Sequence, residues 1–194
     1  MTETAGRAHG LPGVPGGGSP FHETARWAIA LDTLARTGRA AATAVAEREL
    51  QESMAAVLTE RFADWAFVDL LHGTRSCRAV AAPRPDTPLI AALTGLPLQD
   101  CPLARSAVRR RTPLVYATLD DPSLLGRLPD GRTVAGALHA HSVAAGPVIA
   151  ARGPYGAITV VRCAGQPYVS FGELQILSEI AGLAGAAIDR LRVR

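Results

Sequence analysis

Apolar side chains recur every three or four positions in residues 21–40 and again in residues 40–62, which is the spacing of one helix face. Ser19-Pro20 predicts the start of the first helix, because proline is favoured at the first helical position, and Gly38 predicts its end. The apolar positions are Trp27, Ala28, Leu31, Leu34 and Ala35, then Leu50, Met54, Val57, Leu58 and Phe62. The chain is therefore expected to begin its ordered part with two helices.

The pattern changes after residue 63 from helical to extended. Residues 64–71 form a β-rich run, and His72-Gly73-Thr74 can turn the chain into an antiparallel partner at 75–82. After three prolines, a short helix is expected at 89–93 and another at 101–110, with Asp100 as its N-cap. A short strand follows at 114–116, and 120–128 is expected to be an irregular or helical connection.

The last third carries the clearest pattern. Two strands, 142–151 and 155–163, flank Arg152-Gly153-Pro154, which predicts a hairpin. Ser170 and Glu173 have the spacing of a capping box and predict the start of a long helix. One apolar stripe of that helix is Leu174, Leu177, Ala181, Ala184, Ile188 and Leu191, and a second is Ile176, Ile180, Leu183 and Ala187. An apolar surface this wide indicates a second packing partner besides the sheet, and we expect another subunit. The whole pattern predicts an α+β domain with an antiparallel sheet.

Composition sets the domain organisation. The 194 residues are 48% hydrophobic, which suits one compact domain. Residues 1–20 are rich in glycine and proline and are expected to be disordered; 21–40 form the first helix and 41–194 the domain. We find no apolar run long enough for a signal peptide or a membrane span. The three cysteines lack CxxC spacing, which favours reduced thiols and a cytoplasmic protein.

The chain contains no lysine and no asparagine, so all 20 positive side chains are arginines. This excludes Schiff-base chemistry on a lysine and the lysine of a phosphate-binding P-loop. The net charge of +3 is small and its arginines are dispersed, which argues against a nucleic-acid partner. The run Arg109-Arg110-Arg111 fits either an anion or partner site or a solvated helix end.

Taken together, these segments resemble a GAF domain, the small-molecule sensing fold of signalling proteins. The resemblance covers residues 48–192 and is closest to the GAF modules that accompany PAS and phosphatase domains in actinobacterial regulators. It rests on residues 61–71 (RFADWAFVDLL), 107–115 (AVRRRTPLV), 142–151 (SVAAGPVIAA), 156–161 (GAITVV) and 171–191.

The resemblance implies an antiparallel sheet of about six strands, with helices on one face and a ligand pocket on the other. It also implies a regulatory module that binds a small molecule or a regulatory protein and forms a homodimer through its terminal helices. No output domain is expected in this chain. The residues expected at the ligand site are Phe67, Asp69, Cys101, Arg105, Tyr116, His139 and His141.

The resemblance leaves several ligand chemistries to weigh. The cyclic-nucleotide form of the family needs an asparagine and a lysine, and the chromophore-binding form commonly uses a Cys-His pair; this sequence has neither. His139 and His141 are candidate haem or metal ligands, and His72, Asp100 or Cys101 could complete a metal site. Cys101 is expected in the first helical turn, where the dipole lowers a thiol pKa. Haem binding, or a redox enzyme using Cys101 with His139 or His141, is thus the alternative to sensing. A third interpretation is a scaffold protein whose pocket is filled by Phe67 and Tyr116.

Overall fold

The computed structural model describes residues 20–73, 75–84 and 87–193, so the expected tail at 1–20 lies almost wholly outside the described residues. Five strands form one antiparallel sheet in the order β2-β1-β5-β4-β3. They are β1 (Trp65–His72), β2 (Arg75–Ala81), β3 (Leu114–Tyr116), β4 (Ala140–Ala150) and β5 (Gly153–Cys163). The α+β class and both expected hairpins are confirmed, while the sheet in the described part has five strands and not six.

The helices follow the expected order with three differences. They are α1 (Pro20–Thr43), α2 (Glu47–Arg61), α3 (Thr87–Thr94), α4 (Pro102–Arg110), α5 (Val134–Leu138) and α6 (Phe171–Arg192), with short 3-10 turns η1 (Leu98–Asp100) and η2 (Pro122–Leu125). Gly38 does not end α1, which continues to Thr43. Asp100 lies in η1, and Cys101 is the N-cap of α4, without a side-chain capping bond. The sequence analysis did not predict α5.

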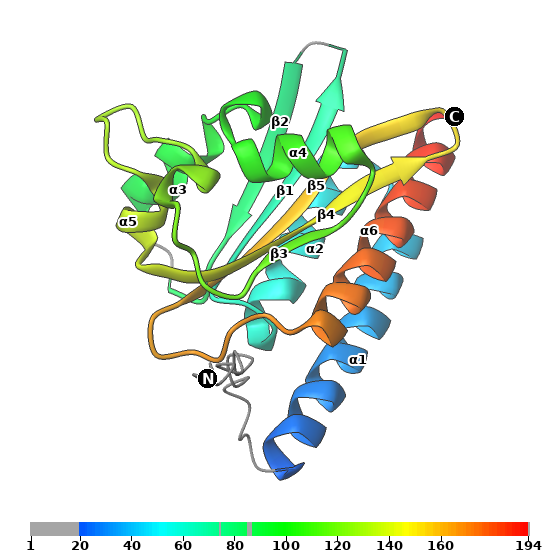
Figure 1. Cartoon of the computed structure of the whole chain (residues 1–194). Coiled ribbons are helices and arrows are strands. Elements are labelled where there is room, and N and C mark those ends of the chain that lie inside the picture. The colour runs from blue at the N-terminus through cyan, green and yellow to red at the C-terminus, as the bar shows by residue number, and fades with distance from the viewer. Residues whose placement is uncertain (1–19, 74, 85–86, 194) are drawn as a thin grey trace, which may run out of the picture.

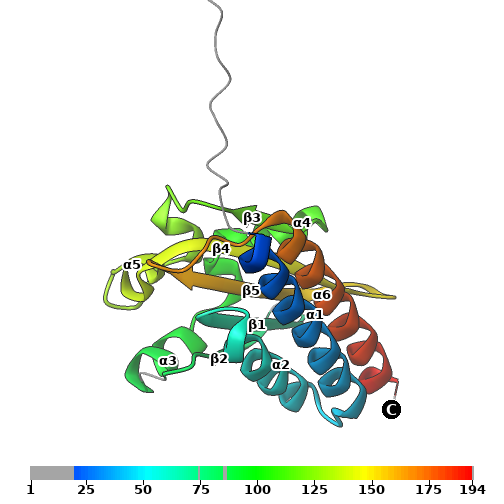
Figure 2. The ribbon, with the colours of Figure 1, turned by 90° about the horizontal axis from the view of Figure 1, so that it is seen from below.

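One face of the sheet is covered by α2 and α6, and α1 packs against both of these helices (Figures 1 and 2). Alternate strand residues point into this layer, among them Val68, Ile158 and Val160. They form the larger apolar core with the inner sides of the three helices. The capping box at the start of α6 is confirmed, with Ser170 and Glu173 bonding reciprocally to each other's backbone amides.

The opposite face of the sheet is also covered. Helix α4 lies across β4 and β5, with α3 and α5 beside it (Figure 1). Phe67 and Val161 from the sheet pack there against Leu93 of α3, Leu103 of α4 and Leu138 of α5. Apolar side chains therefore fill much of the face on which the resemblance placed a pocket.

Helices α1 and α6 lie side by side and run in the same direction (Figures 1 and 2). The Trp27 ring lies against Gly172 near their N-terminal ends. At the other end, Arg190 donates hydrogen bonds of 2.8–2.9 Å to the carbonyls of Ala41, Ala42 and Ala44.

Among the described residues, only α6 has the length and apolarity of a membrane-crossing helix, and half of that stretch is buried, as in a core helix of a folded domain.

Candidate functional site

Asp69 of β1 and Arg78 of β2 form an ion pair within the α4 face of the sheet. The two residues are directly opposite in the β1–β2 register. Arg78 donates from Nε to Oδ1 at 2.7 Å and from Nη2 to Oδ2 at 3.0 Å, and Nη2 also lies 3.0 Å from the Cys101 sulfur. The guanidinium stacks 5.1 Å from the centre of the Phe67 ring. Both charged side chains are almost completely removed from solvent.

Burial sets the protonation of this cluster. It raises the pKa of Asp69, although the charge and hydrogen bonds of Arg78 oppose the change. Burial also raises the pKa of the Cys101 thiol, and Arg78 only partly offsets it. The thiol lies 3.4 Å from the carbonyl of Leu125. The expectation that the helix start would lower the pKa of Cys101 is therefore wrong, because desolvation outweighs the helix dipole.

The cluster leaves one donor open. Nη1 of Arg78 is buried and has no hydrogen-bond partner among the described residues. Buried donors without an acceptor are rare in folded proteins, since each costs its lost hydration. The described residues therefore provide no acceptor for Nη1 of Arg78.

A groove of about 560 Å³ lies beside the edge strand β2, between α2 and α3. We call it the β2 groove. Its wall consists of Glu47, Arg48, Gln51 and Glu52 of α2, His72 of β1, Cys77, Arg78, Ala79 and Val80 of β2, and Ile90 and Thr94 of α3. Arg78 is one of these lining residues, although only 1% of its side chain is exposed and its guanidinium lies against Phe67 and Cys101.

The structure brings together three of the seven residues expected at the ligand site. Phe67, Asp69 and Cys101 are neighbours through Arg78, but all three are buried. Arg105 is exposed on α4, and Tyr116 is partly exposed on β3. None of the seven lines the β2 groove or the three smaller cavities of 260–400 Å³ that we find.

The two candidate histidines, His139 and His141, lie on different elements and differ in exposure. His139 ends α5 in a left-handed conformation and is exposed, and His141 lies half-buried in β4. No group of three or more His, Cys, Asp or Glu side chains within the described residues has the geometry of a metal site. In the described part of the chain, His139 and His141 are therefore not members of a metal site with three or more such ligands.

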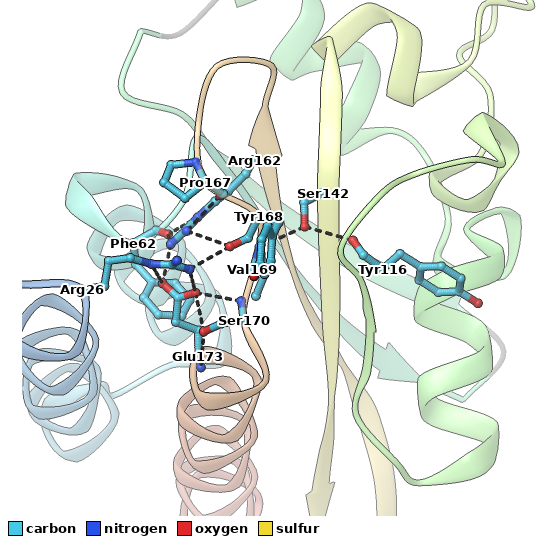
Figure 3. A network of polar contacts seen from close by, with 10 residues as sticks. All are labelled: Arg26, Phe62, Tyr116, Ser142, Arg162, Pro167, Tyr168, Val169, Ser170 and Glu173. Atoms are coloured by element: carbon cyan, nitrogen blue, oxygen red, sulfur yellow. Dashed lines mark hydrogen bonds and ion pairs between the residues drawn. The ribbon is translucent and has the colours of Figure 1, made fainter. Parts of the chain in front are cut away.

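The sequence analysis missed a second polar network, on the α2/α6 face (Figure 3). Arg162 of β5 donates to Glu173 at 2.8 Å and to the carbonyl of Phe62 at 2.8 Å, and its Nη1 donates to the carbonyls of Pro167 and Tyr168. Arg26 of α1 pairs with the same carboxylate. Hydrogen bonds from Arg26 and from the Ser170 amide, with the charge of Arg162, outweigh burial and lower the pKa of Glu173.

This network extends toward the far edge of the sheet (Figure 3). The hydroxyl of Ser142 in β4 donates to the carbonyl of Tyr116 at 2.9 Å and accepts from the amide of Val169 at 3.0 Å. The loop before α6 is thereby fixed to β3 and β4 on one side. On the other side it is fixed to α1 and to the end of α2.

Comparison with known proteins decides the fold. No protein-family model and no curated protein sequence matches the chain. Among solved structures, a GAF domain from a Coxiella burnetii phosphoenolpyruvate-protein phosphotransferase has a TM-score of 0.66 at 15% identity, covering 86% of this chain and 96% of its own. The corresponding domain from Acinetobacter has a TM-score of 0.63 at 16% identity, covering 84% and 94%. The chain has the fold of a GAF domain.

A further GAF-like neighbour is an enzyme. Free methionine-R-sulfoxide reductase from Neisseria meningitidis, solved with its substrate, has a TM-score of 0.63 at 17% identity and covers 86% of this chain and 92% of its own. Because the structural neighbours include both GAF domains and an enzyme, the fold does not assign the function. The function has to be inferred from the side chains of this chain.

Proposed function

We propose that this chain is a cytoplasmic regulatory GAF module that acts as a homodimer. It binds a small molecule or a regulatory protein, and it transmits the bound state through α1 and α6. The observation that carries the proposal is a set of exposed large apolar and small residues on the outer face of the α1–α6 pair.

That outer face combines exposed apolar and small residues with the exposed Gln175 and Glu179 of α6. Trp27 and Leu31 on α1 are 41% and 53% exposed, and Phe171 at the start of α6 is 80% exposed. Gly182 and Ala186 are exposed on α6, and a Cβ built on Gly182 would contact nothing. Small residues let a second helix approach closely, while large apolar residues gain by burial. A second copy packed here would form a four-helix interface.

Direct polar contacts connect α1 and α6 to the sheet, so a movement of the sheet can be transmitted to both helices. Arg26 ties α1 to Glu173, and Arg162 ties Glu173 to β5 and to the end of α2. A shift of the sheet would therefore be passed to both helices through direct polar contacts. A ligand produces such a shift only if it binds two arrangements of the domain with different affinity.

The oligomeric state tests the proposal. We expect the purified full chain to sediment as a dimer, and Leu31→Glu to shift it to monomer, because a charge would be buried at the centre of the interface. The matched control is Ala91→Glu, which adds the same charge on the exposed side of α3. A wild-type monomer, or a dimer equally weakened by both substitutions, would contradict the interface.

The geometry favours this role over thiol catalysis. A nucleophilic cysteine needs access and a lowered pKa. Cys101 is 4% exposed and its pKa is raised by burial, and Cys163 is half-buried with its pKa raised to about 11, also by burial. The similarity to the sulfoxide reductase therefore extends to the fold and not to an activated thiol at either position.

A further inference from the structure

The outer side of α4 carries four exposed arginines that no acidic side chain neutralises. We call them the α4 arginines: Arg105, Arg109 and Arg110 of the helix, and Arg111, which is its C-cap. None of the four forms an ion pair with another described residue. Arginines elsewhere on the surface do, since Arg36, Arg48 and Arg132 each pair with a carboxylate. The positive charge on α4 is therefore unusual for this molecule.

The surroundings of the α4 arginines also lack acidic residues. Between Asp100 and Asp120 the sequence contains no aspartate or glutamate. The strands that α4 covers, β4 and β5, and the strand that follows it, β3, contain none either. Asp69 on the neighbouring strand β1 is buried and is already paired with Arg78. The C-terminal part of α4 thus presents an unbalanced positive charge to solvent.

Helix stability explains only part of this charge. Cations near a helix C-terminus are favoured by the helix dipole, but the effect is modest on an exposed surface. Arg190 shows how an arginine can serve a helix end, since it donates to three carbonyls at the end of α1. Among the described residues, no guanidinium in residues 109–111 donates to a carbonyl, and Arg105 makes one such bond, of 3.2 Å, to Gln99. These donors can therefore bind a partner without breaking an internal network.

Arg111 occupies a backbone position that disfavours its side chain. It ends α4 with a φ of 53°, in the left-handed region where a Cβ atom is crowded by the backbone. Glycine is the usual residue at this place in a helix end. Unfavourable backbone conformations are found mainly at functional sites, where the side chain is needed for another purpose. Arg111 adds a fourth charge to the cluster where glycine would suit the fold better.

The size of the cluster and its charge indicate the kind of partner. Residues 105–111 extend over about 9 Å of helix axis, which suits a short run of carboxylates. Carboxylates pair with guanidinium groups through two parallel hydrogen bonds. Nucleic-acid sites commonly use about six to ten phosphate contacts, and the exposed Asp100 at the other end of α4 would repel a longer polyanion. All exposed residues of α4 are arginines, so the helix offers no apolar side chain to enter a bilayer.

We propose that the α4 arginines dock an acidic segment of a partner protein, whose aspartate or glutamate side chains pair with the guanidinium groups. The inference rests on the proposed function, because it names the surface and the charge of the regulatory protein that the module would bind. Helix α4 and the α1–α6 pair lie on opposite faces of the sheet (Figure 1). The acidic segment and the second copy can therefore be bound at the same time.

The probe for the test is fluorescein-labelled octaglutamate, titrated with the full chain and followed by fluorescence anisotropy. We expect saturable binding at about 50 mM salt and about tenfold weaker binding at about 200 mM, because salt screens exposed ion pairs. Arg109→Gln/Arg110→Gln should weaken binding about tenfold through the loss of two such pairs. The control, Arg39→Gln/Arg61→Gln, removes two exposed arginines from α1 and α2 and changes the net charge equally. It should bind the peptide as the parent does.

Arg111 provides a second and independent measurement. Arg111→Gly removes the crowded Cβ, so this variant should unfold at a higher urea concentration than the parent. It should also bind octaglutamate about threefold more weakly, because one ion pair is lost. A variant that is more stable and binds as tightly as the parent would exclude Arg111 from the docking surface.

Other anions and the oligomeric state complete the test. Tighter binding of a labelled thymidine octanucleotide or of phosphatidylglycerol vesicles than of octaglutamate, at the same salt concentration, would overturn the assignment of a protein partner. Equal affinities of Arg109→Gln/Arg110→Gln and its control would overturn the site, and a dimer that Leu31→Glu disrupts would then still support the proposed function. If the protein binds octaglutamate through α4 but is monomeric, the docking surface stands and the homodimer is refuted.

Discussion

On the α2/α6 face of the sheet, Arg162 has an acceptor for each of its three nitrogens, and its carboxylate partner Glu173 is shared with Arg26. On the α4 face, Arg78 holds Asp69 in two hydrogen bonds but leaves Nη1 without an acceptor among the described residues. Both arginines are buried on the same sheet. One network is complete within the chain, and the other has one donor left over.

The difference lies in hydrogen-bond satisfaction and not in the presence of a cavity, since Arg26, Arg162 and Glu173 line one of about 260 Å³. The Arg162 network joins α1, α2, β5 and the start of α6, and its satisfied donors leave nothing to offer a ligand. The Arg78 cluster joins only two neighbouring strands and the start of α4, and it lies beside a groove. We therefore expect the two networks to respond differently when their charges are removed.

The largest effect is expected for Asp69→Leu, which leaves the Arg78 charge buried and alone. Loss of one partner of a buried ion pair typically costs about 3–5 kcal/mol of unfolding free energy. The paired variant Asp69→Leu/Arg78→Leu should lie within about 1 kcal/mol of the parent, since apolar residues of similar size often replace such a pair without loss. Urea denaturation of the three proteins measures both values. Equal loss in the single and paired variants would mean that the pair stabilises the fold by itself.

A somewhat smaller loss, about 3 kcal/mol, is expected for Arg162→Leu. The substitution removes the donor from the carbonyls of Phe62, Pro167 and Tyr168, but Glu173 keeps its contact with Arg26. Arg132→Leu serves as the control, because Arg132 is 67% exposed and pairs with an exposed aspartate. The control should denature at the same urea concentration as the parent. An Arg162→Leu protein as stable as its control would show that the network contributes nothing net.

The sequence predicted the parts of the fold that depend on local pattern. Both hairpins, the short strand β3 and the capping box of α6 were recognised because alternation and capping act over a few residues. Helix α5 was missed because its five residues, Val134–Leu138, contain a glycine and span little more than one turn. Gly38 was mistaken for a helix end because glycine is common there, whereas α1 continues to Thr43 and packs along its length on α2 and α6.

The site could be predicted only in part. Asp69 was named, but the expected turn at residues 72–74 would place it opposite Cys77, whereas the observed register pairs His72 with Arg75 and Asp69 with Arg78. A buried aspartate in an apolar strand requires such a cation. The Arg162 network had no comparable signal, because Arg26 and Glu173 are 147 residues apart. The β2 groove likewise forms only when α2 and α3 are placed on either side of the edge strand.

The smallest expected effect is a difference in acid sensitivity, in which the two carboxylates act with opposite sign. The pKa of Glu173 is lowered from its ordinary value of 4.5 by its partners, so its stabilising contribution is present above that value and is lost as the pH falls through the folded-state pKa. The pKa of Asp69 is raised from 3.8 by burial, so on acidification the folded state binds this proton at a higher pH than the unfolded state does. The contribution of Asp69 to stability therefore decreases as the pH rises through the raised value.

Unfolding free energies measured in urea between about pH 3 and 6 test this contrast, since one carboxyl changes the slope by at most about 1.4 kcal/mol per pH unit. Glu173→Gln should flatten the loss of stability below the ordinary glutamate pKa, because the group that gains a proton on unfolding is gone. Asp69→Asn should make the same loss steeper, because it removes a group that favours the folded state in acid. If both variants change the slope in one direction, the two faces do not hold their carboxylates in different ways, and the contrast between a complete network and an open one loses its electrostatic basis.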